Sequence, residues 1–178
     1  MLVYTQNGIG PLTLIRFKMK LHVSAVGKLK NGPERTLCGD YFERAAQMGR
    51  RAGISALTVT EHAESQAKTA DLRKVDEAAR LLGSCSSIAY VIALDERGKD
   101  MTSDAFAGEL SRLLDNGTRE VAFLIGGPDG HAAAVHGRAG LVVSLGKMTW
   151  PHRLARVLLA EQIYRSVTIL VNHPYHRE

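Results

Sequence analysis

An apolar run ends at paired glycines in Leu124-Ile125-Gly126-Gly127-Pro128-Asp129-Gly130, and small residues follow at 132–138. This order is typical of a buried strand, a tight turn and a short helix. Glycine in such a turn lets a ligand or another backbone segment approach closely, and free N–H groups at a helix start suit an anionic or polar ligand. The turn matches neither the dinucleotide fingerprint nor the phosphate loop, which disfavours nucleotide-phosphate binding. A tight turn without a ligand is the alternative interpretation.

Strand and helix patterns alternate along the rest of the chain. Strands are predicted at residues 20–26, 54–60, 87–94, 121–125 and 140–145, and helices at 34–51, 67–82, 103–116, 132–138 and 153–166. This alternation predicts one α/β domain with a mostly parallel sheet. The helix at 67–82 is expected to face inward through Leu72, Val75, Ala79 and Leu82, and residues 95–99 are expected to form a polar turn.

Composition narrows the function classes. The 178 residues, 45% hydrophobic and 23% charged, fit one soluble domain with a sizeable core. No apolar run is long enough to span a bilayer, no secretory signal is recognisable, and Cys38 and Cys85 stand alone, so we expect a reduced, cytoplasmic setting. Residues 1–18 are interpreted as an extension before a single domain at 19–178. The net charge of +5 favours an anionic partner without identifying one.

Three predicted strands end in segments that can bind ligands: Leu94-Asp95, Gly127 and the turn at 146–151. Ligands of open α/β sheets collect at the carboxyl ends of the strands, so these segments are expected to share one pocket. The helix at 153–166 is apolar on most sides, which predicts burial in a core or an oligomer interface. Glu161 and Arg165 have the spacing of a helical ion pair.

The C-terminal tail is rich in titratable side chains, namely His173, Tyr175, His176 and Arg177. A metal site on the two histidines is disfavoured because Pro174 separates them and no cysteine or carboxylate cluster completes a ligand shell. The tail is also suited to RNA contact, with arginine on phosphate, tyrosine stacking on a base and histidine moving a proton. A tail that is basic by chance is the third interpretation.

Four stretches occur in order: Ile125-Gly126-Gly127-Pro128, Ser144-Leu145-x-x-Met148-Thr149-x-Pro151-His152, Arg156…Glu161-Gln162-x-Tyr164-Arg165 and His173-Pro174-Tyr175-His176-Arg177-Glu178. With them, residues 19–178 closely resemble the small SPOUT-family methyltransferases that act on a pseudouridine of bacterial 23S rRNA. The resemblance implies the α/β-knot fold with a C-terminal trefoil knot, S-adenosylmethionine as cofactor, and a homodimer whose active site is assembled across the interface. It implies the assembled ribosome as substrate and no metal.

The resemblance also implies roles for individual residues. The residues expected to bind the cofactor are Leu94, Gly127, Gly146, Lys147, Met148, Thr149, Trp150 and Pro151. From the chemistry of their side chains, we further expect the tail residues Tyr175, His176 and Arg177 to serve the partner's cofactor site in methylation of pseudouridine N3. His176 is the expected proton acceptor, with His152 or water as alternatives. A SPOUT methyltransferase with another RNA target and a non-catalytic ribosome-binding factor of the same fold are the competing functions.

Overall fold

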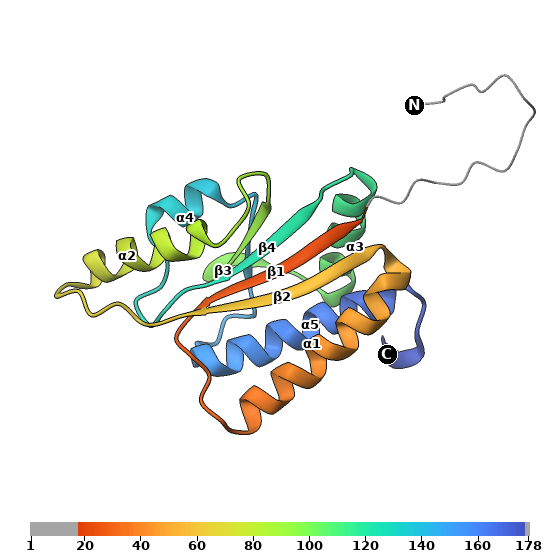
Figure 1. The fold of residues 1–178 in the computed structure, drawn as a ribbon, viewed down its shortest axis with the longest axis horizontal. Coiled ribbons are helices and arrows are strands. Elements are labelled where there is room, and N and C mark those ends of the chain that lie inside the picture. Colours follow the sequence, from red (N-terminus) through yellow and green to blue (C-terminus); the bar gives the residue numbers. More distant parts are fainter. Residues whose placement is uncertain (1–17, 177–178) are drawn as a thin grey trace, which may run out of the picture.

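A five-stranded parallel sheet forms the centre of the molecule in the computed structural model, which describes residues 18–176, with the side chains of 18–175 (Figure 1). The strand order is β2-β1-β4-β3-β5, and every neighbouring pair is parallel. The strands are β1 Met19–Val26, β2 Ile54–His62, β3 Tyr90–Asp100, β4 Glu120–Ile125 and β5 Leu141–Ser144. The helices are α1 Pro33–Ala52, α2 Ala70–Gly83, α3 Ser103–Asp115, α4 Ala133–Arg138 and α5 His152–Leu170. The predicted α/β class is confirmed, and the knotted path stays a prediction.

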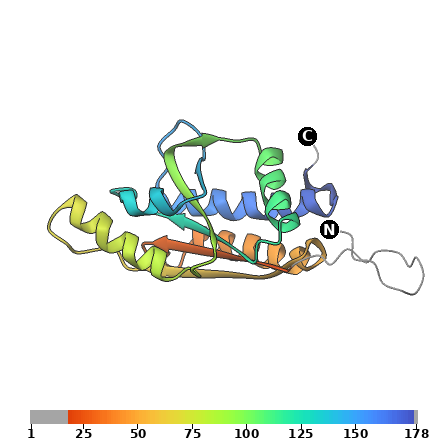
Figure 2. The same cartoon turned by 90° about the horizontal axis from the view of Figure 1, so that it is seen from above.

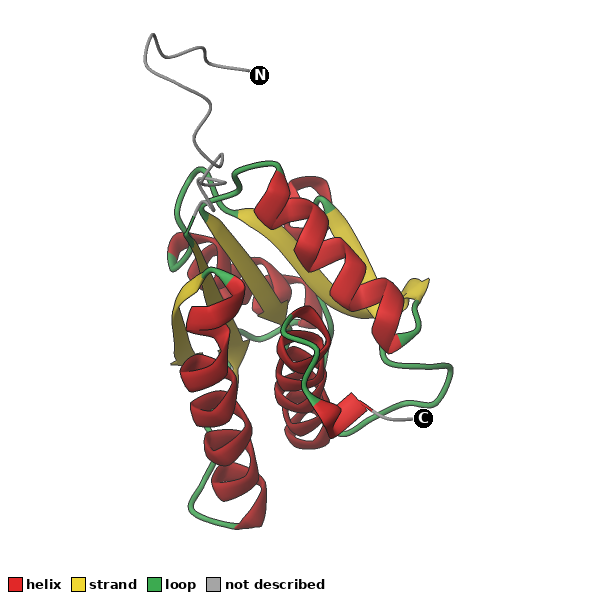
Figure 3. Ribbon diagram, turned by 90° about the vertical axis from the view of Figure 1, so that its right-hand side faces the viewer, coloured by secondary structure: helices red, strands yellow, loops and turns green. Residues whose placement is uncertain are grey.

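Helices cover both faces of the sheet, in two groups (Figures 1 and 3). On one face α1, α3 and α5 pack against alternate residues of β1 and β4, including Leu21 and Phe123, which are fully buried. On the other face α2 and α4 pack against a smaller apolar cluster that includes Leu81 and Leu124. The core is therefore divided by the sheet, as expected when parallel strands are connected by helices.

Strand β1 is buried on both faces from Leu21 to Val26, although apolar and polar residues alternate along it. Its buried polar residues His22 and Ser24 each form side-chain hydrogen bonds, while His22 Nε2 has no partner among the described residues. A 2.8 Å hydrogen bond joins His22 Nδ1 to Thr58 Oγ1, and Ser24 Oγ lies 3.0 Å from His62 Nε2. Buried polar groups persist where they are paired in this way.

The inward face predicted for α2 is wrong. Leu72 and Val75 are 56% and 61% exposed, whereas Glu77 is 3% exposed. Glu77 accepts the backbone N–H of Ser65 at 2.9 Å. Apolar periodicity was misleading here because the buried side of α2 carries hydrogen-bonding groups as well as Ala78 and Leu81.

Strand β3 continues through the segment that was predicted to be a turn. Its pairing with β5 runs from Ile92 to Leu94 and resumes at Lys99 after a shift of register. Gly98 permits this path, because a Cβ there would lie 2.5 Å from the Val143 carbonyl carbon. The long end of β3 therefore stays beside β5.

Helix α5 extends beyond both predicted ends and packs on α1 and α3. Figure 2 shows α5 running along the body toward the C-terminus. Residues 174–176 then form a short 3-10 turn. In the part of the chain that the structure describes, no helix has the length and apolar character needed to cross a membrane.

Candidate functional site

A cavity of about 380 Å³, a size typical of small-molecule sites, opens at the carboxyl ends of β4 and β5, beside residues 94–97 of β3, where the pairing of β3 with β4 ends. β3 lies between β4 and β5 in the sheet, so the loops that follow β4 and β5 meet beside it. The expected shared pocket is confirmed: Leu94-Asp95, Gly127 and most of the 146–151 turn line one cavity. The predicted cofactor residues in its lining are Leu94, Gly127, Gly146, Met148, Thr149 and Trp150. Lys147 and Pro151 belong to the same turn and are exposed outside the lining.

The glycine turn after β4 is shaped by the chain's own packing. A Cβ on Gly127 would lie 2.7 Å from Glu77 Oε2, and one on Gly126 would lie 3.2 Å from the Gly130 carbonyl. The turn is closed by Gly130 N–H donating to Gly127 O at 2.9 Å, with Gly130 at a φ of +81°. The glycines therefore form a tight turn that is a wall of the cavity, and ligand binding by this turn stays a prediction.

Helix α2 supports this turn from behind. Arg73 Nε and Nη2 donate to the two carboxylate oxygens of Asp129, at 2.7 and 3.0 Å. The hydrogen bond from Arg73 holds the pKa of Asp129 below its ordinary value. One Glu77 oxygen has no hydrogen-bond partner among the described residues and lies against Gly127. The turn is thus fixed before any ligand arrives.

The turn between β5 and α5 forms the opposite wall and is organised by its own polar groups. Ser144 Oγ donates to Gly146 O at 2.9 Å and accepts Gly146 N–H at 3.1 Å. Trp150 Nε1 donates to Leu145 O at 3.2 Å. Met148 is 73% exposed, and Trp150 is 39% exposed. This wall therefore presents backbone groups and the apolar side chains of Met148 and Trp150 to a ligand, and both side chains remain partly exposed to solvent.

A second cavity of about 290 Å³ lies against the same turn, between the end of β3, α3 and α5. It shares residues 143–146 with the first cavity and adds apolar side chains, among them Phe106 and Leu159. The sequence did not predict this cavity, because its lining depends on how α3 and α5 cross the sheet.

A titratable wall of the first cavity was missed by the sequence reasoning. His136 Nε2 donates to Asp95 Oδ2 at 3.0 Å, and His131 Nε2 donates to Leu94 O at 3.1 Å. Burial lowers the pKa of His131. Burial acts to raise the pKa of Asp95, but hydrogen bonds from Arg97 N–H and His136 outweigh it, so that pKa lies below its ordinary value. The available signal was a histidine directly after the glycine turn and a second one five residues later.

His152, the alternative proton acceptor, is the first residue of α5 and also lines the first cavity. Its Nε2 lies 3.5 Å from the position that a Cβ on Gly27 would occupy. The structure therefore brings the end of β1 and the start of α5 together at the cavity's edge.

The tail lies at the other end of α5. The Tyr175 ring is 4.7 Å from the Tyr164 ring, with the Arg165 guanidinium 5.2 Å from its centroid. Burial, together with a hydrogen bond involving Tyr41, raises the pKa of Tyr175 to about 12, so its phenol is protonated at neutral pH. The predicted ion pair of Glu161 with Arg165 is confirmed at 2.8 Å. The His176 side chain and Arg177 lie outside what the structure describes.

Tyr175 folds back onto α5, with its Oη 3.3 Å from Glu161 Oε1, whereas the cavity is lined on this helix by His152 and Ala155. At about 1.5 Å per residue, the rise from Ala155 to Glu161 is roughly 9 Å. None of the tail residues that the structure describes is part of the lining of the cavity of its own chain. Within residues 18–175, no three His, Cys, Asp or Glu side chains are grouped as metal ligands.

Comparison with known proteins gives the family. A family model described as predicted SPOUT methyltransferase matches residues 19–176. Two proteins with the name ribosomal RNA large subunit methyltransferase H, from Brucella anthropi and Rhizobium meliloti, are each 49% identical over 159 residues, covering 89% of this chain and 99% of the relative. A solved structure of the SpoU methyltransferase AviRb from Streptomyces viridochromogenes, in complex with AdoMet, has a TM-score of 0.38 and 11% identity over 86% of this chain and 62% of that chain. On the first two findings, this chain belongs to the SPOUT methyltransferase family.

Proposed function

We propose that this protein transfers a methyl group from S-adenosylmethionine to N3 of a pseudouridine in 23S rRNA of the assembled ribosome, in the cytoplasm. The observation that carries the proposal is that one cavity is shared by the glycine turn after β4, residues 94–97 of β3 and the turn after β5. Family membership, and relatives whose names specify the large-subunit ribosomal RNA, support it.

The residues present fit the cofactor. Backbone groups of Leu94, Gly127 and the 146–151 turn would hold it between fixed walls, beside apolar surface from Met148 and Trp150. When bound, S-adenosylmethionine supplies a methyl group already activated on a sulfonium. The protein's own contribution is then to align the acceptor with that methyl group and to remove a proton from N3.

The tail is proposed to act in a homodimer, on the cavity of the partner. Tyr175 packs on Tyr164 and is not among the residues that line the cavity of its own chain, and α5 carries exposed Leu154 near its start. A second copy would cover such apolar surface and bring its tail to the cavity. Because the pKa of Tyr175 is raised to about 12, Tyr175 is assigned to positioning the base. Arg177 is assigned to the developing anion or a phosphate, and His176 to the proton, with His152 or water as alternatives.

Truncation after Asn172 tests the tail. The truncated protein is expected to lose methylation of ribosomes that lack the mark, while calorimetry finds cofactor affinity nearly unchanged. Unchanged turnover would refute the role of the tail. Mass spectrometry of 23S rRNA from a deletion strain tests the substrate, since loss of a methyl group from a tRNA instead would identify another RNA target. Failure to bind S-adenosylmethionine would favour a non-catalytic ribosome-binding factor.

A further inference from the structure

The loop between β1 and α1 presents two lysines on either side of a buried anchor. Leu29 is 8% exposed and packs with Cys38 and Ala160. Its neighbours Lys28 and Lys30 are both exposed. Burial of the central side chain holds the two flanking ammonium groups at the surface of the loop.

Hydrogen bonds fix the backbone of this loop. Arg156, 5% exposed on α5, donates to Val26 O at 2.5 Å and also to Gly27 O. Glu61 accepts from Arg156 at 2.5 Å and from Leu29 N–H at 3.0 Å. The loop is therefore held by β2 and α5 together, which reduces the conformational entropy that a ligand would have to restrict.

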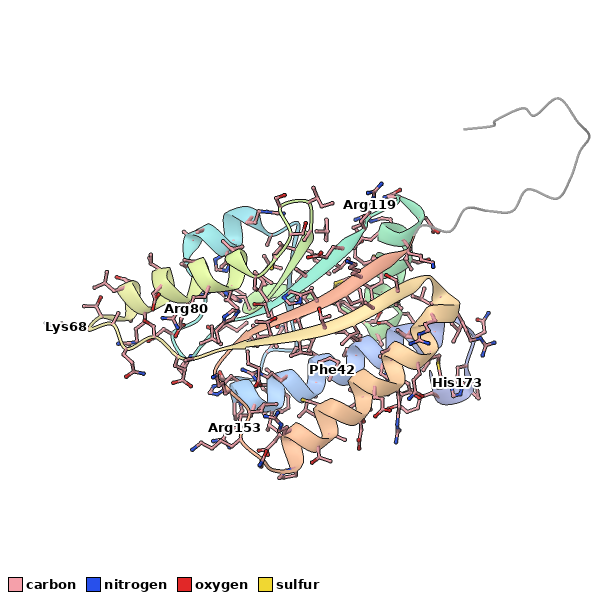
Figure 4. All side chains as sticks on the ribbon, in the orientation of Figure 1. Phe42, Lys68, Arg80, Arg119, Arg153 and His173 are labelled. Carbon is pink, nitrogen blue, oxygen red and sulfur yellow. The ribbon has the colours of Figure 1, made fainter. Side chains whose placement is uncertain are left out.

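The lysines lie close to the cavity and are not neutralised. Gly27, directly before Lys28, is next to His152 of the cavity lining. Arg153 follows His152 and is exposed. Across residues 18–175, no ion pair involves Lys28, Lys30 or Arg153. Figure 4 places Arg153 at the same end of the molecule as Lys68, opposite the end that carries Arg119 and His173.

Fixed, exposed and unpaired cations around a cavity mouth fit a polyanion. Three carboxylates lie beside the loop: Glu34 next to Gly32, Glu61 on Leu29 N–H and Glu64 next to Gly27. Glu61 is occupied by Arg156, and the other two form no ion pair in the described chain. Lysine and arginine contacts to phosphates supply affinity and orientation without reading base identity. We propose that Lys28, Lys30 and Arg153 bind the phosphate backbone of the RNA that presents its target base to the cavity; this inference rests on the proposed function.

The test compares two charge-matched double variants. Lys28→Gln/Lys30→Gln removes two charges beside the cavity, and Lys20→Gln/Arg119→Gln removes two exposed charges at the amino ends of β1 and β4. Binding to ribosomes from a strain that lacks the methyl mark is measured by cosedimentation over a series of KCl concentrations. Each phosphate contact with single-stranded RNA adds about 0.7 to the magnitude of the slope of log K against log salt, so the loss of two contacts in the loop variant should reduce that magnitude by about 1.4. Cofactor affinity should remain that of the unaltered protein.

Three results would overturn the inference: an unchanged salt slope in the loop variant, an equal loss in the control variant, or no ribosome binding by the unaltered protein. Methylation is measured separately on the same ribosomes. Ribosome binding with the expected slope change but without any methylation would contradict the proposed function and leave the RNA-binding surface supported. Full methylation with an unchanged slope would support the proposed function and contradict the inference that these cations bind the RNA.

Discussion

Arg156 is expected to be the most stabilising charged side chain of α5. It bridges the end of β1 to Glu61 of β2 from within the core, with the Arg156 and Glu61 side chains 5% and 23% exposed. Replacing Arg156 by Met leaves Glu61 with one backbone donor and removes the donor that Val26 O and Gly27 O share. Breaking a buried pair from one side costs about 3–5 kcal/mol. Because Glu61 is partly exposed, we expect Arg156→Met to lower the free energy of unfolding by about 3 kcal/mol, the lower end of that range.

The assay is urea-induced unfolding followed by far-UV circular dichroism, at one fixed protein concentration because a dimer's stability depends on concentration. Arg165→Met is the matched control on the same helix. Its partner Glu161 is one turn away, and the pair is 31% and 17% exposed, so the loss should stay below about 1 kcal/mol. The loss of free energy of unfolding in Arg156→Lys should fall between those of the two methionine variants, because lysine keeps the charge and lacks the several guanidinium N–H donors of arginine. If Arg156→Met loses no more free energy of unfolding than Arg165→Met, the account of the buried bridge is wrong.

Three further outcomes are expected. Gly127→Ala should lower the free energy of unfolding by about 1–3 kcal/mol, because the added Cβ is overpacked against Glu77. Urea unfolding should show a smaller loss when Gly127→Ala is made in a Glu77→Ala background, and an equal loss in both backgrounds would contradict the contact. Burial lowers the pKa of His22 from 6.5, so the unfolded chain binds more protons than the folded protein below that pH, and the free energy of unfolding falls as the pH drops from about 6.5. In urea titrations, the difference in free energy of unfolding between pH 7.5 and pH 5 should therefore be smaller for His22→Gln than for the unaltered protein. Tyr175→Phe should shift no ionisation in the pH–rate profile below pH 10, because burial raises the pKa of Tyr175 to about 12. An ionisation near pH 9 that is present in the unaltered protein and absent in this variant would make Tyr175 the proton acceptor.

Local patterns predicted most elements because each depends on neighbours in the chain. Thr102 accepts Ala105 N–H as the N-cap of α3, and Gly117 has the positive φ expected after that helix. The prediction failed for α2, where tertiary contacts of Arg73 and Glu77 placed the polar side inward. It failed again at residues 95–99, where polar composition indicated a turn but pairing with β5 kept the backbone extended.

The sequence by itself determined the α/β class, the three segments that line the cavity and, through four ordered motifs, the family. These features follow from periodicity and from short stretches whose residues act together. Only the tertiary structure decided that Asp95 meets His136, that Arg156 supports the loop of Lys28 and Lys30, and that Tyr175 packs on Tyr164 outside the cavity lining. Such contacts join residues far apart in the chain, and their distances depend on how the helices cross the sheet, which no local pattern encodes.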